Sequence, residues 1–234
     1  MSYSKPTTHN SELPLMKCSN CSAEMNAMTM EAHLSAPIEI DMCTPCQSFW
    51  FDKWEDMKLS PGSTLKLLKL IGESSSPRRS APYANVLPCP RCGSHLVFTH
   101  DLQGNTRFSY WRCMNEHGRF IGYLDFLREK SFIRTVSAKE INELRQKIQT
   151  VNCANCGAAI NLTTDSVCTH CGSPISILDV KQPQQWVSDL KQAPEPLKLD
   201  PALFKADPTN DDPSFSLVHA GLSALARWLS SRGF

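Results

Sequence analysis

Paired cysteines constrain this chain more than any other feature of its sequence. Ten of its eleven cysteines form five Cys-x-x-Cys pairs, and the remaining one, Cys113, stands four residues before His117. A pair with this spacing points two sulfurs of one tight turn at a common ion, and two such turns complete a tetrahedral zinc site. Because an odd number of cysteines does not fit a closed disulfide framework, we expect three bound Zn²⁺ ions instead.

The candidate ligands form three sets of four, one for each ion. The second set contains only three cysteines, so we assign its fourth place to His117 on its Cys-x3-His spacing. His95 and His100 are rival ligands, but each lies on a predicted strand. The predicted ligands are Cys18, Cys21, Cys43 and Cys46 in the first set, Cys89, Cys92, Cys113 and His117 in the second, and Cys153, Cys156, Cys168 and Cys171 in the third.

The residue that follows each cysteine pair affects how easily the chain forms the turn that holds the two sulfurs. Glycine, which tolerates a positive φ, follows three of the pairs, at Gly93, Gly157 and Gly172. Ser22 and Gln47 occupy that place in the first set. A redox dithiol is the alternative for an isolated pair, but no βαβ pattern surrounds these pairs. Iron–sulfur ligation is the alternative for four cysteines, and two well-separated pairs among predicted strands favour zinc over it.

The predicted fold class is a small, metal-stabilised α+β protein. It consists of three zinc ribbons with short β-hairpins, connecting helices and a C-terminal amphipathic helix, because the 234 residues look too polar and proline-rich for one large core. The predicted parts are a disordered leader (1–15), ribbon 1 with helices (16–72), a linker (73–86), ribbon 2 with a helix (87–150), ribbon 3 (151–179), a polar linker (180–212) and the amphipathic helix (213–234).

Local patterns place the main elements within these parts. Residues 38–42 alternate apolar and acidic side chains, as a half-buried strand does, and residues 95–100 and 107–111 flank a Gly104-Asn105 hairpin turn. Asp52 and Glu55 have the spacing of an N-terminal helix cap, and Gly72 is expected to end the next helical segment. Ser137 to Glu140 form a full capping box.

The first ribbon resembles a known family. The segment from Ile40 to Cys46 (IDMCTPC), followed by Trp50, Asp52 and Glu55, is similar to the bacterial transcription factor IIB-type zinc ribbons. The resemblance covers about residues 16–57 and departs from the family pattern at Gln47-Ser48, where two glycines are usual. It implies a zinc-ribbon fold for this segment and carries over no activity.

Aromatic residues lie beside the metal turns of the first two ribbons. We expect Trp50, Phe51 and Trp54 to pack against the metal turn of ribbon 1, because a ribbon has little other core. In ribbon 2, basic and aromatic residues are interleaved, which is the combination that single-stranded nucleic acid would use. The candidate nucleic-acid contacts are Arg107, Tyr110, Trp111, Arg112 and Arg119.

The C-terminal helix is the candidate for a protein contact. One of its faces is apolar, and the helix either docks on the ribbons or inserts into a groove of a partner. Its polar face has little positive charge, which disfavours a membrane surface. The candidate contact residues are Val218, Leu222, Leu225, Trp228 and Leu229.

Charge and composition argue against several classes of function for this protein. A four-thiolate zinc site carries a charge of −2 and a three-thiolate site −1, so three ions would lower the formal net charge from +1 to about −4. A global basic field for nucleic acid is therefore absent. We expect no signal peptide and no transmembrane helix, because neither pattern is found, and we find no catalytic motif. We expect a cytoplasmic, non-enzymatic adaptor that engages a protein partner, with nucleic-acid binding as the alternative.

Overall fold

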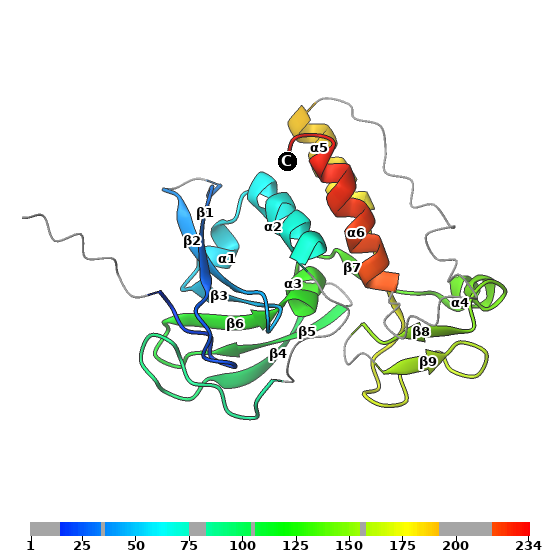
Figure 1. Cartoon of the computed structure of the whole chain (residues 1–234), viewed down its shortest axis with the longest axis horizontal. Helices are drawn as coiled ribbons and strands as arrows, with labels where there is room; N and C mark the ends of the chain where they lie inside the picture. Colours follow the sequence, from blue (N-terminus) through cyan, green and yellow to red (C-terminus); the bar gives the residue numbers. More distant parts are fainter. Residues whose placement is uncertain (1–14, 34–35, 75–82, 104–105, 155–157, 192–216) are drawn as a thin grey trace, which may run out of the picture.

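A six-stranded antiparallel sheet forms the centre of the molecule (Figure 1). The computed structural model describes residues 15–33, 36–74, 83–103, 106–154, 158–191 and 217–234. The strands lie in the order β1-β2-β3-β6-β5-β4. Their bounds are Asn26–Met30 (β1), Ile38–Cys43 (β2), Ser48–Asp52 (β3), Val97–Gln103 (β4), Thr106–Arg112 (β5) and Gly118–Gly122 (β6).

Two three-stranded meanders build this sheet. Strands β1 to β3 make up the first unit (residues 15–60) and strands β4 to β6 the second unit (residues 83–122), and β3 pairs with β6 at the junction. The pairing is antiparallel and centred on Trp50 opposite Phe120. The two units are therefore arranged about an approximate twofold axis, although only their cysteine pairs resemble one another in sequence.

The predicted strands of these units are present. Residues 38–42 lie in β2, and the two strand-like runs of the second unit are β4 and β5, which pair antiparallel. The expected alternation of exposure in β2 is incomplete, because Asp41 is buried as well as its apolar neighbours. Turn residues Gly104 and Asn105 lie outside the described residues.

Helices cover one face of the sheet. Phe49 and Phe51 of β3 and Ile121 of β6 point to this face and pack against Phe126 of α3 and the apolar side of α2. The helices of the described residues are Glu55–Lys58 (α1), Pro61–Ser74 (α2), Tyr123–Glu129 (α3), Ala138–Arg145 (α4), Lys181–Lys191 (α5) and Leu217–Ser230 (α6).

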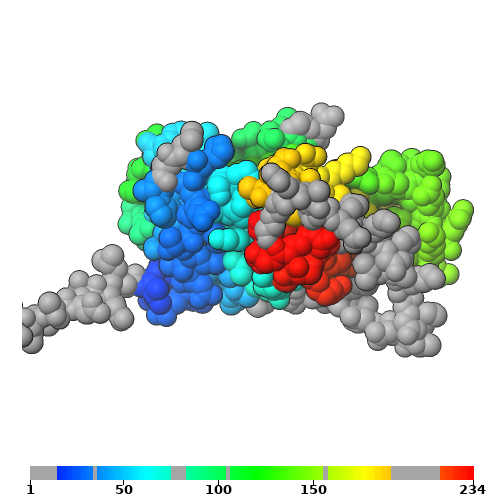
Figure 2. All heavy atoms as spheres, turned by 90° about the horizontal axis from the view of Figure 1, so that it is seen from above, coloured from blue at the N-terminus to red at the C-terminus, as the bar shows by residue number. Residues whose placement is uncertain are grey.

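Helix α6 docks on the rest of the chain instead of offering its apolar face to a partner. It lies beside α2 in Figure 1, and in Figure 2 it lies between the first unit (blue and cyan) and residues 136–178 (yellow-green and yellow). Of the two alternatives that the sequence left open, the structure shows the docked one, with all five candidate contact residues buried in the protein's own core: Val218, Leu222, Leu225, Trp228 and Leu229. The predicted helix start at Pro213 lies outside the described residues.

The third cysteine set belongs to a separate small unit. Strands Thr150–Asn152 (β8) and Ala159–Asn161 (β9) form a hairpin, and Ser176–Leu178 (β10) pairs with Ile133–Thr135 (β7). Helix α4 begins at the predicted capping box, in which Ser137 accepts a hydrogen bond from the Glu140 backbone N–H. This helix packs with the third unit (residues 136–178), although the predicted division assigned it to ribbon 2.

Three further expectations need correction. The first eleven residues after Val180 form helix α5, where a polar linker was expected, because Trp186 and Val187 pack on Phe132 and its neighbours. Gly72 does not end α2, which continues to Ser74.

Asp52 does not cap a helix either. Helix α1 begins at Glu55, and the Glu55 carboxylate accepts a hydrogen bond from the Asp52 backbone N–H. The expected leader and parts of both expected linkers lie outside the described residues. Among the helices that are described, none has the length and apolar character needed to cross a membrane.

Candidate metal centres

Four cysteines of the first unit meet at one end of its meander. Cys18 and Cys21 precede β1, Cys43 is the last residue of β2, and Cys46 lies in the turn between β2 and β3. Their four sulfur atoms all lie within 4.8 Å of one another, and the Cys21 and Cys43 Sγ atoms are 3.6 Å apart. The structure thus brings together the complete first set of predicted ligands.

The second unit repeats this arrangement with a histidine as the fourth member. Cys89 and Cys92 precede β4, and Cys113 and His117 lie between β5 and β6. The His117 Nδ1 atom is 3.4 Å from the Cys113 Sγ atom and 4.0 Å from that of Cys89. The Cys92 and Cys113 Sγ atoms are 3.7 Å apart. His117 therefore occupies the fourth place.

The rival histidines lie elsewhere. His95 and His100 are exposed and belong to no ligand group of the described residues, and the His100 ring nitrogen lies 2.9 Å from the Ser109 hydroxyl.

The third unit brings together Cys153, Cys168 and Cys171. The Cys153 and Cys171 Sγ atoms are 3.6 Å apart. The predicted fourth ligand, Cys156, lies outside the described residues. Three ligands of this set are therefore in place.

The spacing of the ligand atoms fits a tetrahedral zinc ion. Zn–S bonds of about 2.3 Å at tetrahedral angles separate two sulfurs by about 3.8 Å, and a Zn–N bond of about 2.0 Å brings nitrogen and sulfur to about 3.5 Å. The observed S···S separations of 3.6–3.7 Å agree with this geometry. They are far longer than the S–S bond of about 2.0 Å in a disulfide. The residues present can therefore hold a metal ion in each group.

A recurring backbone turn positions these sulfurs. The residue that follows the second cysteine has a positive φ in four pairs: 59° at Ser22, 51° at Gln47, 74° at Gly93 and 70° at Gly172. In three of these turns, its backbone N–H donates to the carbonyl of the first cysteine of the pair. Ser22 and Gln47 thus adopt the conformation that glycine adopts in the other units.

Side-chain amides support the sulfurs. The Asn20 Nδ2 atom lies 3.3 Å from the Cys46 sulfur, and the Asn115 Nδ2 atom lies 3.6 Å from that of Cys92. Donors of this kind stabilise thiolates and so favour metal binding.

Crowding shifts the thiol pKa values apart. Hydrogen bonds from Cys43 and Cys46 lower the pKa of Cys18, and the same contact with Cys18 raises the pKa of Cys43. Burial raises the pKa of Cys89 to about 11, and hydrogen bonds from Ser94 lower that of Cys92 to about 5. Four thiols this close cannot all ionise without a neighbouring cation, whose charge would favour the thiolate form of each.

The first two metal groups share one hydrophobic core. Cysteines from both groups pack with Trp50 and Phe120, which lie opposite each other on the sheet face that the helices leave uncovered. Contacts also cross between the units. The Arg91 guanidinium binds the Asp52 carboxylate at 2.6 Å, and the Tyr83 hydroxyl donates to the Cys46 carbonyl at 3.2 Å. The two centres are therefore parts of one packed structure.

The candidate nucleic-acid residues do not form one surface. Tyr110, Arg112 and Arg119 lie on one face of the sheet, and Arg107 and Trp111 lie on the other. The Arg119 guanidinium is largely buried and binds the Asp56 and Glu129 carboxylates, each at 2.6 Å. Its charge is therefore neutralised within the protein.

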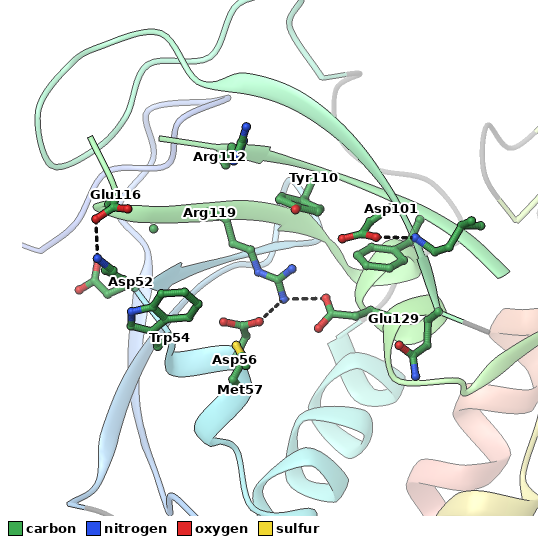
Figure 3. A pocket seen from close by; sticks show the side chains of 15 residues that line it. Asp52, Trp54, Asp56, Met57, Asp101, Tyr110, Arg112, Glu116, Arg119 and Glu129 are labelled. Atoms are coloured by element: carbon green, nitrogen blue, oxygen red, sulfur yellow. Dashed lines mark hydrogen bonds and ion pairs between the residues drawn. The ribbon is translucent and has the colours of Figure 1, made fainter. Parts of the chain in front are cut away.

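A groove on the helix-bearing face of the sheet was not predicted from the sequence. It has a volume of about 580 Å³ and lies between the β4–β5 hairpin and the segment around α1 (Figure 3). Of the three aromatic residues expected to pack against the metal turn, only Trp50 does so. Phe51 packs under the helices on the opposite face of the sheet, and Trp54 is 56% exposed at the groove. The groove depends on the β3–β6 pairing, so no local pattern could have revealed it.

Comparisons with known proteins give no family for this chain. No protein-family model matches it, and no curated protein or solved structure shows significant similarity to it. The function must therefore be inferred from the sites themselves.

Proposed function

We propose that this protein is a zinc-stabilised adaptor, in which three zinc ribbons hold a surface for a protein partner. The observation that carries this proposal is the convergence of three cysteine-rich groups at tetrahedral spacing. The first of these ribbons would be of the transcription factor IIB type, as its cysteine and tryptophan pattern suggests. Zinc is the metal proposed because sulfur and imidazole ligands in a closed tetrahedron are its usual structural site.

A structural role for the metal is supported by the number of ligands. The first two groups each supply four protein ligands, whereas a catalytic zinc keeps one position open for water or substrate. The proposed role is therefore binding without catalysis. Reduced thiols also suit the cytoplasm, which is the compartment that we propose.

A protein partner is supported by the exposed apolar side chains around the groove. Trp54, Met57 and Leu102 are 56%, 71% and 58% exposed, and all three line it. Clustered apolar side chains of this size at a concave surface are typical of interaction sites. The groove also carries more carboxylates than basic groups, which opposes contact with phosphates.

Affinity capture with nuclease treatment tests the proposal. The tagged, zinc-loaded protein is expected to retain one protein partner after nuclease digestion and to lose it when a chelator removes the metal. A matched bait with Trp54→Ala and Met57→Ala, both exposed and outside the metal groups, should lose the same partner. Partners that disappear with nuclease alone, or that persist in the double variant, would contradict the proposal.

Binding of single-stranded nucleic acid is the second candidate. The observation that favours it is an aromatic pair on the other sheet face, where exposed Phe98 packs on Trp111 with 4.7 Å between ring centroids. Arg107 stands on the same face, four residues along β5. Stacking faces and a cation on one surface suit single strands. If the protein binds single-stranded nucleic acid, its affinity for oligonucleotides should fall with rising salt concentration, and Arg107→Glu should weaken that binding. The absence of binding at low salt would eliminate this function.

A further inference from the structure

The groove has the size and composition of a ligand site. Its volume of about 580 Å³ lies within the range of small-ligand pockets, and its wall on the hairpin side includes Phe108 and Tyr110. Trp54 and Met57 line the opposite wall, and Figure 3 shows both facing the hairpin across the groove. A segment lying in it would therefore contact apolar side chains on both sides.

Most charged groups of the groove are paired with one another. Arg119 binds Asp56 and Glu129, and it lies over the Tyr110 ring with 5.0 Å between guanidinium carbon and ring centroid. Lys53 pairs with Glu116, and Asp52 pairs with Arg91. These groups are consequently not available as the main charge contacts of a ligand.

Two charges in the lining remain without an ion pair among the described residues. The Asp101 carboxylate accepts a hydrogen bond only from the backbone N–H of Leu102, and the Arg112 guanidinium has no hydrogen bond or ion pair there. Both side chains are exposed. The groove thus offers one negative and one positive charge to a ligand.

The strand register fixes how far apart these two charges lie. Arg112 of β5 is opposite Val97 of β4, and Asp101 stands four residues further along β4. At about 3.4 Å per residue, four steps separate the two positions by about 14 Å along the strands. Figure 3 shows Asp101 and Arg112 on either side of Tyr110.

We propose that the groove binds an extended segment of a protein partner that carries one acidic and one basic residue four positions apart, with an apolar residue midway. In an extended chain, residues i, i+2 and i+4 point to the same side and span about 14 Å. The acidic residue pairs with Arg112, the basic residue pairs with Asp101, and the apolar residue lies between Tyr110 and Trp54. This inference rests on the proposed adaptor function.

Three kinds of synthetic peptide test the charge pattern. The mixed peptides SETLTKS and SKTLTES fit the groove in opposite chain directions, whereas SETLTES and SKTLTKS each place a like charge at one end. With the zinc-loaded full-length protein, fluorescence anisotropy of labelled peptides should give Kd values about fivefold lower for the mixed peptides. That factor corresponds to an exposed ion pair at the upper end of its usual strength.

Charge reversal of the protein should then switch this preference. Arg112→Glu makes both unpaired charges of the groove negative and should bind SKTLTKS most tightly. Asp101→Lys leaves two cations and should bind SETLTES most tightly. Because each variant gains affinity for one peptide, a folding defect cannot produce the expected result.

Arg107→Glu is the matched control, since Arg107 lies on the same strand as Arg112 but on the other face of the sheet. It should keep the ranking of the unmodified protein. An identical ranking in all four proteins, or no binding of any peptide at millimolar concentration, would overturn the inference. If the protein nevertheless retains a partner after nuclease treatment and loses it when zinc is removed, the adaptor function is supported. Only the proposal of a charge-patterned groove is then contradicted.

Discussion

A positive φ after the second cysteine is the residue-scale feature that all three metal groups share. Ser22 and Gln47 adopt it in the first unit, and Gly93 and Gly172 adopt it in the others. Side chains with a Cβ atom are disfavoured in this region by roughly 1–2 kcal/mol. The first unit therefore holds a conformation that its residue types do not favour locally, and the metal ligands are positioned through it.

Replacing Ser22 by glycine should stabilise the metal-loaded protein. Ser22 is exposed and has a φ of 59°, so the change relieves backbone strain without removing a buried contact. After allowance for the greater freedom of glycine in the unfolded chain, we expect the free energy of unfolding to rise by about 0.5–1 kcal/mol.

Chemical denaturation at a fixed free zinc concentration measures this effect. Gly93→Ala is the reciprocal control, because its Cβ would meet no atom within 4 Å and only its φ of 74° opposes it. It should cost about 1 kcal/mol. A loss of stability in Ser22→Gly would show that this turn is not strained.

Which cysteines and which histidine come together could be predicted from the sequence, because the grouping depends largely on local spacing. The spacing of cysteine pairs fixes which sulfurs share a turn, and the Cys-x3-His spacing selected His117 over His95 and His100. The exposure of Trp54 could not be predicted in this way. Trp54 has a left-handed backbone, with a φ of 69°, at the position immediately before helix α1 and two residues after the end of β3.

At the scale of elements, the close approach of α2 and α6 depends on glycine. A Cβ atom added to Gly72 would lie 2.5 Å from the Leu222 carbonyl oxygen and 2.8 Å from the Ala226 Cβ atom. Neither atom can move without shifting α6. Gly72 is therefore a helix-packing residue and not the helix end that its position in the sequence suggested.

Gly72→Ala should destabilise the protein even though alanine favours a helix. We expect the overpacking to cost about 1–3 kcal/mol, partly offset by about 1 kcal/mol of helix propensity. Thermal unfolding followed by circular dichroism measures the net loss.

Gly62→Ala in the same helix is the matched control, because the nearest atom to its Cβ would be 3.9 Å away. It should leave stability unchanged or raise it by a few tenths of a kcal/mol. Equal effects of the two substitutions would contradict the proposed role of Gly72.

Helices and strands that have a local sequence pattern could be predicted, but the pairing of strands distant in the sequence could not. Strand β2, the β4–β5 hairpin and the capped helix α4 follow from alternation, turn and capping patterns. The β3–β6 pairing joins Trp50 to Phe120 across seventy residues, and nothing in either segment specifies its partner. Helix α5 was missed because its polar residues outnumber Trp186 and Val187, which pack on the core.

At the scale of the whole molecule, the first two metal groups share one hydrophobic core, and the third group lies in another. Cys18, Cys43, Cys89 and Cys113 pack in one core with Trp50 and Phe120, whereas Cys153 and Cys168 pack in another. Loss of metal from the first group should therefore loosen the second. Three ribbons were predicted, and whether they pack together was left open; the core around the third group also includes Leu217 of α6.

Single ligand substitutions test this coupling. Cys43→Ser should reduce zinc retention in both the first and second groups, so that chelator competition removes close to two equivalents more easily. Cys168→Ser, the matched substitution in the third unit, should affect one equivalent. If Cys43→Ser also affects only one, the shared core does not couple the two centres.

The central claim is that metal ions in all three groups hold this fold together, and metal content measures it most directly. Native mass spectrometry and elemental analysis of the purified, reduced, full-length protein should find three zinc ions per chain. Removal of the zinc should abolish the cooperative unfolding transition, because small units of this kind depend on metal for their stability. A folded protein with far fewer than three bound metal ions would contradict the claim.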